Sequence, residues 1–197
     1  MGDPAVNRYE HFTYRQYLTW PDEERWELID GIAWSMSAAP TSRHQEILGK
    51  LHVRFAAFLK GKTCKVFLAP FDVLLPKGDE EDGDVDTVVQ PDLSVFCDRS
   101  KITKPGARGA PDLLIEILSP STTKKDINDK FDRYERAGVR EYWLVDPGNR
   151  SIWLYRRNQE GKFDEGELRE PFRDFSAIAS SVLEGLSIDP EELFSED

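Results

Sequence analysis

The segment 111–120, PDLLIEILSP, constrains the fold of this chain more than any other stretch. Its run of aliphatic residues predicts a buried β-strand. Glu116 lies in the middle of that run, where an ionised carboxylate needs a partner. Because side chains alternate along a strand, Leu114 and Glu116 share one face, whereas Ile115 and Ile117 share the other. The fold must therefore place a partner for Glu116 on the Leu114 face.

A second strand of similar kind, QPDLSVF at 90–96, precedes the first. The short connection between them, DRSKITKPGARGA, favours neighbouring positions in one sheet. Asp92, at the start of its strand, then lies beside Glu116. Two carboxylates about 4 Å apart repel by roughly 4 kcal/mol at an effective dielectric of about 20, and a divalent cation would compensate for this. Two carboxylates, a backbone carbonyl and water form the oxygen shell that Mg²⁺ prefers, so the pair predicts a magnesium site.

Capping and turn signals indicate the helices and one hairpin. Thr13 is the expected N-cap of a short helix within 11–20, and Asp30-Gly31 predicts a hairpin turn between two extended runs. Apolar periodicity predicts a long helix within 40–62, capped by Thr41 or Ser42, and a further helix over 123–137.

The strands complete the expected fold class. Extended runs are expected within the following segments: 64–75, 88–97, 111–118, 140–147, 151–157 and, as a strand or short helix, 176–186. The order of helices and strands predicts an α/β fold in which a mixed β-sheet is flanked by helices.

The length and charge of the chain set the domain organisation. A chain of 197 residues is expected to form a single domain, with a core over about 10–157 and an acidic extension over 160–197. The net charge is −11, but the extension carries 12 acidic and 3 basic residues, whereas 99–140 carries 10 basic and 6 acidic residues. The acidic excess therefore does not by itself exclude a nucleic-acid partner.

Targeting signals and cysteine usage indicate the expected compartment. No apolar run approaches the roughly 20 residues that span a membrane, and the first residues lack the features of a signal peptide, so a cytoplasmic protein is expected. Cys64 and Cys97 lie in apolar stretches and are expected to be reduced core residues. The acidic segment 79–86 departs from the EF-hand pattern, so a solvated loop is favoured over a calcium site.

These motifs together resemble a known family of nucleases. Asp92 in QPD, followed by Glu116 in IEIL, is similar to the PD-(D/E)XK nuclease superfamily. The longer run from QPDLSVF through GAPDLLIEILSPST to DKFDRYERAGVREYWLVDP resembles the Uma-type restriction endonuclease family, as do ELIDG and PTSRHQEI. The resemblance implies a restriction-endonuclease-like fold and the hydrolysis of phosphodiester bonds.

The resemblance also implies roles for individual residues. Asp92 and Glu116 would hold the metal, with help from the carbonyl of Ile117, and Lys130 would act on the attacking water. The superfamily's usual lysine position, two residues after Glu116, is Leu118 here, and Lys130 on the following helix takes its place.

Glu27 and His44 are further candidate site residues, and structural alternatives stand beside these roles. Glu116 and Lys130 would form an ion pair without a metal, and His44 would be a hydrogen-bonded residue at the edge of the core. Asp112 is favoured as a residue that starts its strand. The simplest interpretation is a solvated helix face for Lys124, Lys125 and Arg133. The alternative interpretation is that these residues contact phosphate.

The expected function is a Mg²⁺-dependent or Mn²⁺-dependent endonuclease that acts on nucleic acid, with DNA favoured. A homodimer is expected by analogy with nucleases of this fold. The alternatives are a catalytically inactive module that binds nucleic acid or protein, which the acidic balance favours, and a metal-dependent hydrolase of small phosphoesters.

Overall fold

The computed structural model describes residues 10–21, 23–36, 39–119, 124–169 and 177–196. In the helix over Lys124–Ala137, side chains are described from residue 128 onward. The helices are α1 (Tyr14–Tyr17), α2 (Ser42–Leu59), α3 (Lys124–Ala137) and α4 (Pro190–Phe194). The first strands are β1 (Trp26–Ile29), β2 (Ile32–Ser35), β3 (Lys65–Leu68), β4 (Asp72–Leu74), β5 (Val88–Val89), β6 (Leu93–Phe96) and β7 (Gly106–Arg108). The remaining strands are β8 (Leu113–Ile117), β9 (Glu141–Asp146), β10 (Ser151–Arg156), β11 (Glu167–Arg169), β12 (Ile178–Ala179) and β13 (Ser187–Ile188).

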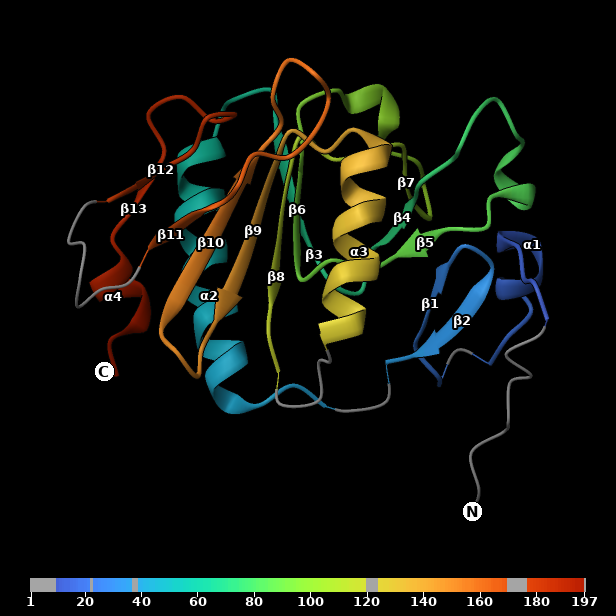
Figure 1. Ribbon diagram of the computed structural model, residues 1–197, viewed down its shortest axis with the longest axis horizontal. Helices are drawn as coiled ribbons and strands as arrows, with labels where there is room; N and C mark the ends of the chain where they lie inside the picture. The colour runs from blue at the N-terminus through green and yellow to red at the C-terminus, as the bar shows by residue number, and fades with distance from the viewer. Residues whose placement is uncertain (1–9, 22, 37–38, 120–123, 170–176, 197) are drawn as a thin grey trace.

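The strands form two larger sheets and one small one. The six-stranded sheet has the order β11-β10-β9-β8-β6-β3, the five-stranded sheet has the order β2-β1-β5-β4-β7, and β12 pairs with β13 (Figure 1). In the six-stranded sheet β8 and β9 are parallel, and the other pairs are antiparallel. The predicted α/β class with a mixed sheet is confirmed, although the sequence did not separate the strands into two sheets.

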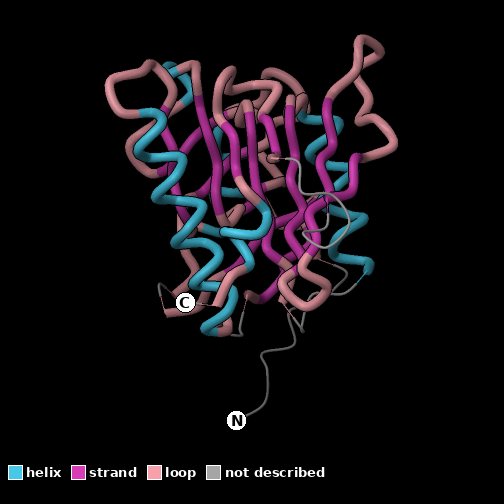
Figure 2. The backbone as a smooth tube through the Cα atoms, turned by 90° about the vertical axis from the view of Figure 1, so that its left-hand side faces the viewer, coloured by secondary structure: helices cyan, strands magenta, loops and turns pink. Residues whose placement is uncertain are grey.

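Helices lie on both sides of the strands (Figure 2). Ile115 and Ile117 pack in one core cluster with Leu51 of α2, whereas Leu114 packs in a second cluster with Tyr134 of α3. The two faces predicted from alternation along β8 are therefore confirmed. Glu116 lies on the α3 side.

Two prolines mark the places where the chain passes between the two larger sheets. Pro70 separates β3 from β4, and Pro91 separates β5 from β6. Proline cannot donate a ladder hydrogen bond, so it interrupts a strand at these positions. Asp92 directly precedes β6 at this crossing and lines a cavity.

The predicted caps and turns occur in the structure. Thr13 and Thr41 are the N-caps of α1 and α2, and the Thr41 hydroxyl accepts a hydrogen bond from the His44 backbone N–H. Asp30 and Gly31 have φ angles of 50° and 74° in the β1–β2 turn, as a two-residue hairpin requires. The strand β7 was not predicted, because its three residues lie in a connection rich in glycine and proline.

The prediction that both cysteines are reduced is wrong. Cys64 and Cys97 form a disulfide. Lys65 pairs with Phe96 in the antiparallel ladder of β3 and β6, so the next position outward sets Cys64 opposite Cys97. Their separation of 33 residues in the sequence concealed this proximity.

The acidic C-terminal region packs on the outer side of α2. Its apolar side chains belong to the same buried cluster as α2: Ile178, Leu183, Leu186, Ile188, Leu193 and Phe194. Arg43 and Lys50 of α2 donate hydrogen bonds to the backbone carbonyl of Ser195. The extension thus contributes to the core despite its charge.

The acidic loop after β4 is tied to the body of the protein by ion pairs. Asp82 pairs with Arg108, Asp84 pairs with Arg15, and Asp86 pairs with Lys77. Within the residues that the structure describes, no helix is both long enough and apolar enough to cross a membrane.

Candidate active site

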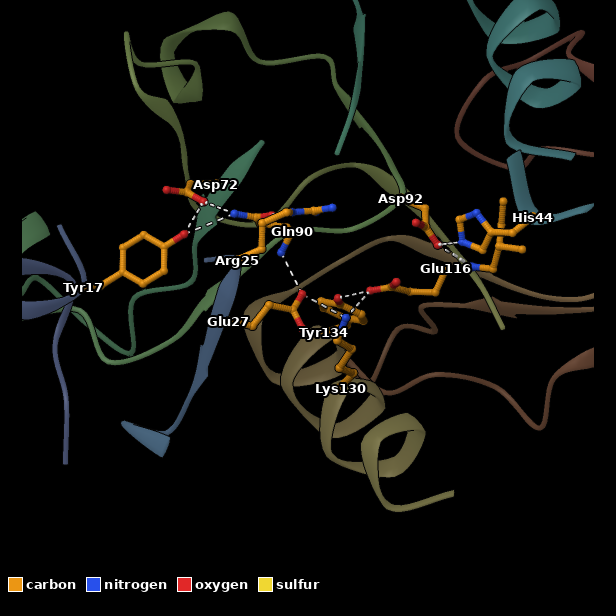
Figure 3. Close-up of polar contacts among 11 residues, drawn as sticks. Tyr17, Arg25, Glu27, His44, Asp72, Gln90, Asp92, Glu116, Lys130 and Tyr134 are labelled. Atoms are coloured by element: carbon orange, nitrogen blue, oxygen red, sulfur yellow. Dashed lines mark hydrogen bonds and ion pairs between the residues drawn. The ribbon is translucent and has the colours of Figure 1, made fainter. Parts of the chain in front are cut away.

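A cavity of about 440 Å³ opens where the two larger sheets diverge. Its lining includes the five side chains predicted from the sequence: Glu27, His44, Asp92, Glu116 and Lys130. They come from β1, α2, the start of β6, β8 and α3 (Figure 3). The fold therefore gathers residues that span more than half of the chain.

Asp92 is held by its neighbours on both sides. Its Oδ2 accepts a hydrogen bond of 2.8 Å from the backbone N–H of Ile117 and lies 3.2 Å from Nε2 of His44. The pairing of Leu93 with Ile115 across β6 and β8 places Asp92 next to Glu116 along the ladder. The predicted adjacency of the two carboxylate positions is confirmed.

Glu116 has found the partners that its position in an apolar strand requires. Its Oε1 accepts hydrogen bonds from the Tyr134 hydroxyl at 2.5 Å and from Lys130 Nζ at 2.9 Å. Burial raises the pKa of Glu116 to about 7, although Lys130 opposes the shift, and the charges of Asp92 and Glu27 add to it. The carboxyl group therefore titrates near neutral pH.

Lys130 bridges two glutamates. Its Nζ donates to Glu27 Oε1 and to Glu116 Oε1, each at 2.9 Å. Burial alone would lower the pKa of Lys130, but the two carboxylates outweigh it and raise the pKa above its ordinary value. Lys130 is therefore an ammonium group that donates hydrogen bonds at neutral pH.

Glu27 is held from the opposite side by the main chain. Its Oε1 also accepts a hydrogen bond of 2.8 Å from the backbone N–H of Gln90, two residues before Asp92. The side chain is only 5% exposed. Glu27 thus links β1 to the strand that carries Asp92.

His44 lies in the first turn of α2 and faces the cavity. Burial lowers its pKa, but the hydrogen bond and charge of Asp92, followed by the charge of Glu116, outweigh burial and raise it. Its Nδ1 is buried and has no hydrogen-bond partner among the described residues. His44 therefore holds Asp92 through Nε2.

Other predicted residues have structural contacts. Asp112 accepts hydrogen bonds from the backbone N–H of Cys97 and from Arg140, which agrees with a role at the start of its strand. Arg133 pairs with Asp30 in the β1–β2 turn, so it is not the simply solvated residue that was predicted. The side chains of Lys124 and Lys125 lie outside the described part of the structure.

Comparison with known proteins assigns the chain to a family. Residues 14–191 match the model of the Uma2 family, described as "Putative restriction endonuclease". The chain belongs to the Uma2 family. The predicted family resemblance is confirmed.

Two relatives support the match to the Uma2 family. An uncharacterised protein of Synechocystis sp. is 28% identical over 149 residues, which is 74% of each chain. A crystal structure from Anabaena variabilis, described as "a putative nuclease belonging to DUF820", superposes with a TM-score of 0.73 at 23% identity, over 93% of this chain and 97% of that one. At this identity the structural likeness shows a shared fold.

The site of this Uma2 family member has a donor set that fits a hard divalent cation. Asp92 Oδ1, Glu116 Oε2 and Glu27 Oε2 accept no hydrogen bond from the described residues, whereas the other oxygen of each carboxylate does. No group of three or more His, Cys, Asp or Glu side chains in the described part of the chain is arranged to hold a metal by itself. Mg²⁺ is bound in proteins by one or two carboxylates and retains water, and Asp92 and Glu116 both line this cavity.

Sequence reasoning missed two residues of this site. Tyr134, which donates a hydrogen bond to Glu116, was not among the predicted site residues; its position four residues after Lys130 was the available signal. Gln90 was not considered, although it precedes the Pro91-Asp92 pair directly. Both supply donors to the glutamates of the cavity.

Proposed function

We propose that this protein is a metal-dependent endonuclease that hydrolyses phosphodiester bonds of nucleic acid, with DNA as the substrate. One observation carries the proposal: the carboxylates of Glu27, Asp92 and Glu116 line one cavity with the ammonium group of Lys130. Each of these three carboxylates keeps one oxygen without a hydrogen bond from the described residues. Membership of the Uma2 family supports the same class of reaction.

Asp92 and Glu116 would hold Mg²⁺ or Mn²⁺, assisted by the carbonyl of Ile117. When bound, the ion supplies charge stabilisation at phosphate and lowers the pKa of a coordinated water. The excess of carboxylates over cationic groups in the cavity favours such an ion, because like charges at short range repel. The contact with His44 Nε2 keeps the Asp92 carboxylate beside Ile117 of β8, whose backbone N–H donates a hydrogen bond to it.

Lys130 would orient the attacking water and offset charge on the phosphate. It is a hydrogen-bond donor and not a general base, because its raised pKa keeps it protonated. Its two glutamate partners fix the ammonium group within the cavity. This arrangement allows a lysine from α3 to serve although Leu118 occupies the usual position.

The expected partners follow from this function. Nucleic acid would enter the cavity, and a second copy of the chain would be needed to cut both strands of a duplex at one place. Cytoplasmic DNA would be the accessible substrate.

The alternative function is a catalytically inactive binding module. It is favoured by the ion pairs of Lys130, which connect Glu27 and Glu116 without a metal. In that case the network would stabilise the fold and no ion would bind.

The test uses supercoiled plasmid DNA incubated with Mg²⁺ or Mn²⁺. Wild-type protein is expected to convert the plasmid to nicked and linear forms, and Glu116→Gln is expected to reduce the rate at least about 100-fold, since it removes a metal ligand. Cleavage that persists in Glu116→Gln would indicate a contaminant and refute the assignment.

Calorimetric titration with Mn²⁺ separates the alternatives. The nuclease is expected to bind the ion, with binding lost in Asp92→Asn. A wild-type protein that binds duplex DNA without binding Mn²⁺ would support the inactive module. Hydrolysis of a small phosphodiester without cleavage of DNA would support the small-substrate alternative.

A further inference from the structure

A second polar network, formed by side chains, adjoins the cavity and is joined to the candidate site through the hydrogen bond from the Gln90 backbone N–H to Glu27 (Figure 3). Gln90 is at its centre. The Gln90 Nε2 donates to Asp72 Oδ1 at 2.9 Å and to the Tyr17 hydroxyl at 3.1 Å, and Tyr17 in turn donates to Asp72. These partners fix the amide orientation, because a carboxylate must receive the NH₂ group.

The opposite side of the Gln90 amide holds an arginine. Gln90 Oε1 accepts hydrogen bonds from Arg25 Nη2 at 2.8 Å and from Arg25 Nε at 3.2 Å. The Arg25 carbonyl also accepts a hydrogen bond from the backbone N–H of Met36, which extends the pairing of β1 and β2 at the open end of the hairpin. Both the main chain and the guanidinium of Arg25 are therefore fixed in place.

Arg25 keeps a positive charge that its direct partner does not neutralise. It forms no ion pair with a carboxylate in the described part of the chain; its charge acts on Asp72 only as one influence that lowers the pKa of that group, which burial raises overall. The side chain is exposed and lines the same cavity as Asp92 and Glu116. Its Nη1 donates no hydrogen bond to any described residue.

We propose that Arg25 binds a backbone phosphate of the nucleic-acid strand in the cavity, with Gln90 holding its guanidinium in position. A guanidinium has five donors, and the contacts with Gln90 leave the Nη1 side available for a phosphate oxygen. An acidic cavity repels a polyanion, so a fixed cation at its rim is what a phosphate chain needs there. This inference rests on the proposed function and adds a substrate contact to it.

The test measures binding of a fluorescein-labelled 20-bp DNA duplex by anisotropy over a range of salt concentrations. All variants carry Glu116→Gln, which prevents cleavage under the proposed function. Arg25→Gln is compared with Arg15→Gln, an exposed arginine that does not line the cavity. Thermal melts confirm that both variants are folded.

The loss of one phosphate contact reduces the slope of log K against log salt by about 0.9, which is about eightfold in affinity at 0.1 M salt. This result is expected for Arg25→Gln on every duplex sequence, with no change for Arg15→Gln. Equal slopes for both variants, in a protein that still binds and whose wild type cleaves DNA, would overturn the role of Arg25 and leave the nuclease intact. A protein that neither binds nor cleaves nucleic acid would refute both proposals.

Discussion

Two glutamates on neighbouring strands show how differently a fold can use the same side chain. Glu116 of β8 faces a cavity, shares it with Asp92 and Glu27, and keeps one oxygen without a hydrogen bond from the described residues. Glu141 of β9 is completely buried, and both of its oxygens are occupied.

The partners of Glu141 are neutral donors from one contiguous stretch and one tryptophan. Oε1 accepts from Trp143 Nε1, and Oε2 accepts from the Ser180 hydroxyl and the backbone N–H groups of Ser181 and Val182. Glu141 thus anchors the C-terminal region to the six-stranded sheet. A buried carboxylate whose two oxygens both accept hydrogen bonds is structural, whereas one whose pKa is raised and which keeps an oxygen without a hydrogen bond is suited to bind an ion.

The largest expected effect comes from removing the ammonium group of the cavity. Lys130→Met leaves Glu27 and Glu116 without their shared cation, and breaking such a buried pair costs about 3–5 kcal/mol. The loss should be larger at pH 8 than at pH 5, since Glu116, whose pKa is raised to about 7 by burial, can take up a proton in acid. Urea unfolding at the two pH values measures it, and an equal loss at both would contradict the assigned charges.

The matched change in the second glutamate should act on stability alone. Glu141→Gln replaces an acceptor oxygen by a donor facing serine and backbone donors, and unsatisfied buried groups of this kind predict a loss of about 3 kcal/mol. For a chain of this size that is a decrease in melting temperature of roughly 6–12 °C. DNA cleavage measured well below the melting temperature should stay at the wild-type rate; a selective loss of cleavage would remove the distinction between the two glutamates.

The pH dependence of stability should report Glu116. Its folded pKa, about 7, is above its unfolded value, so the folded state holds the proton more tightly and stability falls as pH rises from about 4.5 to 7. The contribution is at most about 3 kcal/mol, since one pKa unit corresponds to about 1.4 kcal/mol. Melting curves of wild type and Glu116→Gln across this range should converge in acid and separate toward neutral pH, with wild type the less stable. A constant difference would show that Glu116 does not titrate there.

The smallest expected effects come from removing one hydroxyl beside each glutamate. Tyr134→Phe and Ser180→Ala should each cost about 1 kcal/mol. Because the Tyr134 hydrogen bond lowers the pKa of Glu116, Tyr134→Phe should also move the pH transition upward. Ser180→Ala should leave that transition unchanged, and a shift in both variants would indicate a global effect of destabilisation.

Local patterns were sufficient to predict most elements of the fold. Thr13, Thr41 and Asp30-Gly31 determine caps and a turn through contacts within a few residues, so they can be recognised from the sequence. The disulfide could not be predicted in this way, because the register of β3 and β6 sets it.

The two glutamates show the same limit for the candidate site. In IEIL and in REYWLV a carboxylate adjoins apolar strand residues, and neither stretch indicates which glutamate meets a cavity. Asp92, Glu116 and Lys130 could be proposed because their motif resembles that of a nuclease family. Arg25 and Tyr17 belong to no such motif, and Gln90 stands in QPD without a role that the motif would assign to it.

The sequence by itself determined the two faces of β8, the limits of α2 and α3, and the family, since alternation, capping and motif spacing are properties of short segments. Only the tertiary structure decided that Lys130 bridges Glu27 and Glu116. It also decided that Glu141 accepts hydrogen bonds from residues 180–182, and that Gln90 holds Arg25 at the cavity. These contacts join segments between 14 and 103 residues apart. Strand register and the packing of α3 on the sheet set such distances, and no local pattern encodes them.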